Sequence, residues 1–149
     1  MPLTKVVKVD AKEPEEKFIE EAAEIVLQGG LVIFPTETVY GLGGNFFDKR
    51  AVDRIYEIKK RPLNKPLTLH IAAGSMIENM GCEITDLAEV LISKFWPGPL
   101  TIILKCQKGE KVGFRMPCNK VALDLIEKAG VPLVAPSANI SGKKPPLDA

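Results

Sequence analysis

Short apolar runs alternate with segments of helical periodicity along most of this chain, and this alternation constrains the fold more than any other feature. Strands are expected at 4–9, 31–34, 67–71, 100–104, 112–116 and 132–135. Helices are expected between them, from about Pro14 to Gly29 and after the capping residues Asp48, Thr85 and Asn119. Strands alternating with helices indicate one α/β domain with a mostly parallel or mixed sheet and flanking helices.

The spacing of apolar residues predicts which helix faces are buried. Those faces are Phe18, Ala22, Ile25 and Val26 in the first helix, Val52, Ile55 and Tyr56 in the second, and Leu87, Val90, Leu91 and Phe95 in the third. The run 31–34 is continuously apolar, which predicts a strand covered on both faces.

Composition and cysteine usage suggest a cytoplasmic protein. The chain has 149 residues, with 46% hydrophobic and 26% charged side chains, as in ordinary globular domains. It contains no apolar stretch long enough to span a membrane. The three cysteines, Cys82, Cys106 and Cys118, show no C-x-x-C spacing. They therefore predict neither a structural zinc site nor a disulfide framework, and they fit a reducing compartment.

A basic segment indicates an anion-binding site. Residues 49–70 carry seven basic side chains against two acidic ones. Within them, Pro62 and Pro66 restrict the backbone that presents Arg61 and Lys65. A planar guanidinium beside a mobile ammonium suits a polyphosphate, although a solvated helix face is the alternative interpretation.

Two further loops carry polar groups directly after predicted strands. The loop 35–44 combines hydroxyls with glycines that let a ligand approach the backbone. The loop 135–142 brings two serines and Asn139 together. Alone, the loop 35–44 is as typical of a turn as of a site, and the loop 135–142 is more typical of a polar turn. His70 is the only histidine, and Arg115 lies near a strand end as a candidate partner for a carboxylate.

Six motifs in one order carry a family resemblance. They are Pro-Thr-Glu-Thr-Val-Tyr-Gly-Leu from Pro35, Lys-x-Arg-Pro-x-x-Lys-Pro-Leu from Lys59, His-Ile from His70, Trp-Pro-Gly-Pro-Leu-Thr from Trp96, Arg-Met-Pro from Arg115, and Pro-Ser-Ala-Asn-Ile-Ser-Gly from Pro136. In this order they closely resemble the YrdC-like family of threonylcarbamoyl-AMP synthases, over residues 22–146.

The resemblance implies a reaction and its partners. It implies synthesis of threonylcarbamoyl-adenylate from ATP, L-threonine and bicarbonate, with release of pyrophosphate and with Mg²⁺ carried on the phosphates. The product would feed the transferase machinery that modifies the adenosine beside the tRNA anticodon, and direct binding of tRNA or double-stranded RNA is a further expectation. The implied fold is a twisted mixed parallel and antiparallel sheet around a positively lined cavity.

The resemblance also implies residue roles. Thr38, His70 and Ser137 match positions that contact threonine, and Arg115 matches the position that holds its carboxylate. Arg61, Lys65 and Asn139 match ATP-contacting positions, and Lys59 belongs to the same basic motif, so Lys59, Arg61 and Lys65 are the catalytic candidates. No metal-ligating side chain is implied.

The chain departs from the family pattern at its C-terminal end. The family commonly has a serine or threonine near the place of Leu147, and its domain continues past residue 149, so this chain is expected to lack the C-terminal segment. Two alternatives remain. One is an RNA-binding module without catalysis, and the other is a carbamoyl-adenylate-forming domain of the hydrogenase-maturation type.

Overall fold

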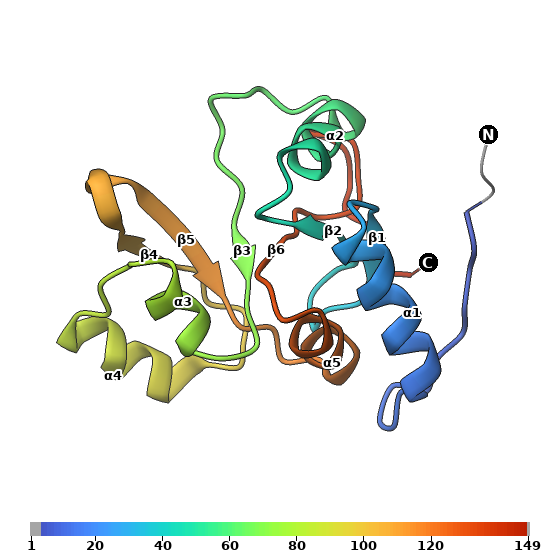
Figure 1. Ribbon diagram of the computed structural model, residues 1–149, viewed down its shortest axis with the longest axis horizontal. Helices are drawn as coiled ribbons and strands as arrows, with labels where there is room; N and C mark the ends of the chain where they lie inside the picture. Colours follow the sequence, from blue (N-terminus) through green and yellow to red (C-terminus); the bar gives the residue numbers. More distant parts are fainter. Residues whose placement is uncertain (1–3, 149) are drawn as a thin grey trace.

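A mixed sheet forms the centre of the structure (Figure 1). The computed structural model describes residues 4–148, and in this range the sheet has six strands in the order β1-β2-β6-β3-β5-β4. The strands are β1 Val32–Phe34, β2 Gly41–Asn45, β3 Leu69–His70, β4 Ile102–Lys105, β5 Lys111–Arg115 and β6 Leu133–Val134. β3 and β5 pair in parallel, and the other neighbours pair antiparallel. The expected mixed sheet is therefore confirmed, with antiparallel pairing predominant.

Helices cover the sheet and enclose two apolar clusters. They are α1 Glu16–Leu27, α2 Lys49–Lys59, α3 Ser75–Asn79, α4 Asp86–Phe95 and α5 Lys120–Ala129, and a short 3₁₀ turn spans Gln107–Gly109. One cluster contains Phe114 and Trp96 and joins the sheet to α2, α3 and α4. The other contains Phe34 and Leu125 and lies where α1 packs against α5 (Figure 1).

Local capping signals predicted the starts of three helices correctly. The side chain of Asp48 accepts a hydrogen bond from the backbone of Arg50, that of Thr85 from Ala88, and that of Asn119 from Ala122. These caps satisfy backbone N–H groups that a helix leaves free in its first turn.

One predicted strand is absent, and the predicted burial of another was wrong. Residues 4–9 form no strand, although their apolar residues alternate. Val6 in this segment is 80% exposed. The run 31–34 does contain β1, but β1 is an edge strand paired only with β2 among the described strands. Ile33 is 54% exposed as a result, so the strand is not covered on both faces.

The predicted faces of α1 and α4 were rotated. In α4 the buried side is Ala88 with the half-buried Leu91 and Ile92, whereas Leu87 and Val90 are exposed. In α1 the buried residues are Ile19, Ala23 and Val26. Both helices are apolar around much of their circumference, so periodicity admitted more than one face.

Strand β2 was missed because the sequence there is rich in glycine. Glycine is depleted in strands, and the segment read as part of a loop. Its glycines permit close packing instead: a Cβ atom on Gly43 would lie 2.5 Å from the Phe34 ring, and one on Gly44 would lie 2.9 Å from Leu31. The short helix α3 was also missed.

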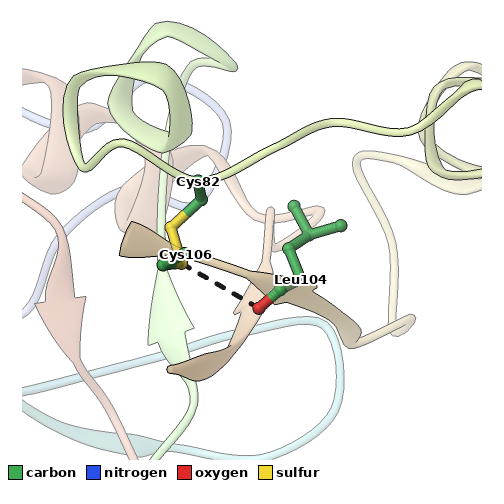
Figure 2. Close-up of a disulfide and its surroundings, with 3 residues drawn as sticks. All are labelled: Cys82, Leu104 and Cys106. Carbon is green, nitrogen blue, oxygen red and sulfur yellow. Dashed lines mark hydrogen bonds between the residues drawn. A yellow bond between two sulfur atoms is a disulfide. The ribbon is translucent and has the colours of Figure 1, made fainter. Parts of the chain in front are cut away.

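Cys82 and Cys106 form a disulfide, which contradicts the prediction made from cysteine spacing (Figure 2). Cys82 follows α3 and is buried, while Cys106 follows β4, 24 residues later. A backbone hydrogen bond from Glu83 to Lys105 holds the two segments side by side, and the spacing of the cysteines in the sequence carries no information on this pairing. Because two of the three cysteines are paired, the cysteines no longer indicate a reducing compartment. Cys118 is free and exposed.

No helix in residues 4–148 combines the length and apolar character needed to cross a bilayer.

Candidate functional site

Side chains from all three polar loops meet in one pocket of about 250 Å³. The lining includes four of the predicted residues, Arg61, His70, Arg115 and Ser137. Thr36, Val39, Tyr40, Gly41, Leu67, Thr68, Thr101, Ala135 and Pro136 complete it. Backbone hydrogen bonds from Leu42 to Pro136 and from Ala138 to Tyr40 hold two of these loops together. The sheet therefore presents three loops to a common space. We call 35–44 the first loop, 59–67 the second loop and 135–142 the third loop.

His70 and Arg115 lie side by side on the floor of this pocket. They are register partners in the parallel pair of β3 and β5, which places them on the same face of the sheet. His70 is only 5% exposed, and burial together with the nearby Arg115 charge lowers its pKa to about 3. The imidazole is therefore neutral at pH 7.

Both side chains retain unused polar atoms. His70 Nδ1 and Arg115 Nε are buried and have no hydrogen-bond partner within residues 4–148. Buried polar groups are normally paired, so each of these two atoms has a hydrogen bond left to make with a ligand or a water molecule.

Lys59 is held away from this pocket. Its side chain is 3% exposed, and Nζ donates to the backbone carbonyls of Ser137 and Asn139, each at 2.6 Å. Burial and the neighbouring Arg61 charge lower its pKa below the ordinary value. The backbone of Ser141 also donates to the Lys59 carbonyl. Lys59 thus anchors the loop that carries Ser137 and Asn139.

Arg61 and Lys65 belong to a loop that Arg61 itself stabilises. The Arg61 guanidinium donates to the carbonyls of Pro66 at 2.8 Å and Lys65 at 3.3 Å. The Tyr56 hydroxyl donates to the same Lys65 carbonyl at 2.8 Å. Arg61 lines the pocket, whereas the Lys65 side chain is exposed to solvent. The loop is rigid through these bonds as well as through its prolines.

Thr38 and Asn139 are not among the residues that line the pocket. Thr38 Oγ1 accepts from Arg115 Nη2 at 3.2 Å. Asn139 Nδ2 donates to the carbonyls of Ile140 and Lys143, while its Oδ1 is buried and has no partner in the described chain. Thr38 therefore adjoins the pocket through Arg115, and Asn139 adjoins it through the Lys59 amine, which binds the carbonyls of both Ser137 and Asn139.

Sequence reasoning missed Glu37, Thr36 and Thr101. Glu37 forms an ion pair with Arg115 across 78 positions in the sequence. Its position between two threonines of the first motif was visible, but nothing in the sequence linked it to Arg115. Thr36 uses its hydroxyl to bind Val39 and so shapes the first loop.

Comparison with known proteins identifies the family. The family model for Sua5/YciO/YrdC, described as telomere recombination, matches residues 24–149. The chain belongs to this family. This chain is 47% identical to a threonylcarbamoyl-AMP synthase of Pyrococcus abyssi, and the match covers 91% of this chain and 42% of the relative. It is 44% identical to the Bacillus subtilis protein of that name, over 88% of this chain and 41% of the relative.

A solved structure agrees with the fold. The crystal structure of Pyrococcus abyssi Sua5 complexed with L-threonine superposes with a TM-score of 0.86 at 47% identity. The match covers 90% of this chain and 42% of the Pyrococcus protein. The chain thus spans about two fifths of the length of these relatives.

Proposed function

We propose that this chain provides the threonine- and nucleotide-binding portion of an L-threonylcarbamoyladenylate synthase, a nucleotidyltransferase. The observation that carries the proposal is the pocket in which neutral His70 and cationic Arg115 offer unpaired polar atoms, with Arg61 also on its wall. The names of the relatives and the threonine bound to the Pyrococcus protein support it. Four residues to which the family resemblance assigns a role line this pocket: Arg61, His70, Arg115 and Ser137.

The proposed reaction has two steps. The threonine amine and bicarbonate form a carbamate with loss of water. A carbamate oxygen then forms a bond to the α-phosphorus of ATP while the bond to the β-phosphate breaks, and pyrophosphate leaves with that electron pair. No covalent bond to the protein forms, so the protein contributes positioning and charge stabilisation.

Each side chain has a task in this scheme. Arg115 binds the substrate carboxylate, because a guanidinium matches a carboxylate in shape and charge. His70 and Ser137 offer neutral hydrogen bonds to the rest of the amino acid, and Thr38 acts beside Arg115. Arg61 contacts the phosphates, with Lys65 and the Oδ1 atom of Asn139 as further contacts.

We propose no protein-bound metal for this site. Among the described residues, no group of three His, Cys, Asp or Glu side chains is placed to hold an ion. We propose that Mg²⁺ arrives on the ATP phosphates, which neutralises part of their charge. The product would serve tRNA-modifying transferases in the cytoplasm, and direct contact with tRNA would show a steep salt dependence.

Pyrophosphate release tests the proposed function. Incubation with ATP, threonine and bicarbonate should release pyrophosphate, and omission of any one substrate should abolish the signal. Because the carbamate is the nucleophile, the reaction needs both of its precursors. Release that does not depend on threonine would refute the proposal.

Arg61→Ala should reduce this activity by about 10²-fold, because a charge-stabilising donor beside the transferred group is lost. The matched control is Arg54→Ala, since Arg54 is an exposed arginine on α2, outside the pocket. Thermal unfolding of both variants separates activity from stability. A folded Arg61→Ala variant with the activity of the control would exclude a role for this guanidinium.

A further inference from the structure

Arg115 already has an anionic partner within the protein. Glu37 Oε1 accepts from Arg115 Nη2, and Glu37 Oε2 accepts from the backbone N–H of Cys118. The side chains of Arg115 and Glu37 are only 14% and 20% exposed. The carboxylate thus joins the first loop to the end of β5, on which Arg115 lies.

We call the contacts of the Glu37 carboxylate with Arg115 and Cys118 the Glu37 clamp. The position of Cys118 strengthens this clamp. Cys118 immediately precedes Asn119, which caps α5. A carboxylate beside the start of a helix is favoured by the positive end of the peptide dipoles. Glu37 is therefore held by a side-chain cation and by a backbone donor on the same segment.

The clamp uses one side of the guanidinium and leaves another free. Arg115 Nη2 donates to Glu37 and to Thr38 Oγ1, while Nε is buried and has no partner in the described chain. An arginine has five N–H donors in a fixed plane, so fixing Nη2 also fixes the direction of Nε. Arg115 lines the pocket, so the direction that Glu37 gives the guanidinium also decides how its donors lie relative to a ligand there.

We propose that Glu37 is a positioning residue that orients Arg115 and thereby sets the preference for a ligand with a free carboxylate. The inference rests on the proposed function, because it takes the amino-acid substrate as that ligand. Glu37 is also the ion-pair partner of Arg115, so selection depends on the direction of the guanidinium donors as well as on its charge.

Calorimetric binding of L-threonine and L-threoninamide tests this inference. The amide lacks the carboxylate but keeps the rest of the molecule, so the affinity ratio of acid to amide reports on Arg115. In the Glu37→Gln variant we expect threonine to bind about tenfold more weakly, as for the loss of one well-directed hydrogen bond to a charged group. Binding of the amide should change little, and the exposed control Glu57→Gln should match the wild type.

Two outcomes would overturn the inference. Tighter threonine binding by Glu37→Gln would mean that Glu37 competes with the substrate for Arg115. Equal weakening for acid and amide would mean that Glu37 only supports the fold.

A wild-type chain that binds neither compound would refute the proposed function instead, and thermal unfolding then tests Glu37 separately. If Glu37 holds Arg115, the double variant Glu37→Gln, Arg115→Gln should lose less stability than the sum of the single variants. Additive losses would contradict the clamp.

Discussion

Lys59→Met is expected to lower the free energy of unfolding by about 3 kcal/mol, because two buried carbonyls lose their donor. Methionine keeps the length and apolar packing of the side chain, so the change isolates the amine. Lys59 continues the buried stripe of Ala51 and Ile55 on α2, and its Nζ atom holds Ser137 and Asn139. Urea unfolding measures the loss, and Arg54→Ala is the exposed control on the same helix.

The pH dependence of this difference has a defined sign. Burial lowers the pKa of Lys59 in the folded protein below its ordinary value of 10.5. Between these two pKa values the unfolded chain binds more protons, so stability gained from Lys59 rises with pH in that window. The wild type should gain stability there relative to Lys59→Met. A variant as stable as the wild type throughout would show that Lys59 does not anchor the loop.

Loss of the Cys82–Cys106 disulfide is expected to cost about 3 kcal/mol, because the bond closes a loop of 24 residues in the unfolded chain. For a protein of this size the loss corresponds to a fall of about 10 °C in the unfolding temperature. Replacement of both cysteines by alanine, or addition of a reductant, should give this change in a calorimetric scan.

Cys118→Ala is the matched control, because this thiol is exposed and unpaired. It should leave the unfolding temperature unchanged. A wild type whose unfolding temperature does not respond to reductant would contradict the disulfide.

The sequence predicted the fold best where the signal is local. Asp48, Thr85 and Asn119 cap helices through side chains that reach only two or three residues along the chain. The predictions failed where tertiary contacts decide the outcome. The glycines of β2 pack closely against Phe34 and Leu31, and Cys82 meets Cys106 only because the segment after α3 lies beside the end of β4.

The candidate site shows the same division. The ordered motifs selected residues that do gather around one pocket, since Arg61, His70, Arg115 and Ser137 line it. They did not determine where each side chain points. Lys59 was grouped with the catalytic residues, but its amine is directed to buried carbonyls, and the pairing of Glu37 with Arg115 depends on how loops far apart in the sequence meet.

Incorporation of radiolabelled bicarbonate shows whether this chain forms threonylcarbamoyl-adenylate. We expect a labelled product that contains both threonine and AMP, formed only when ATP and threonine are present, and reduced by about 10²-fold in Arg61→Ala. A chain that binds threonine and ATP but forms no labelled adenylate, or that incorporates label without threonine, would contradict the proposed function.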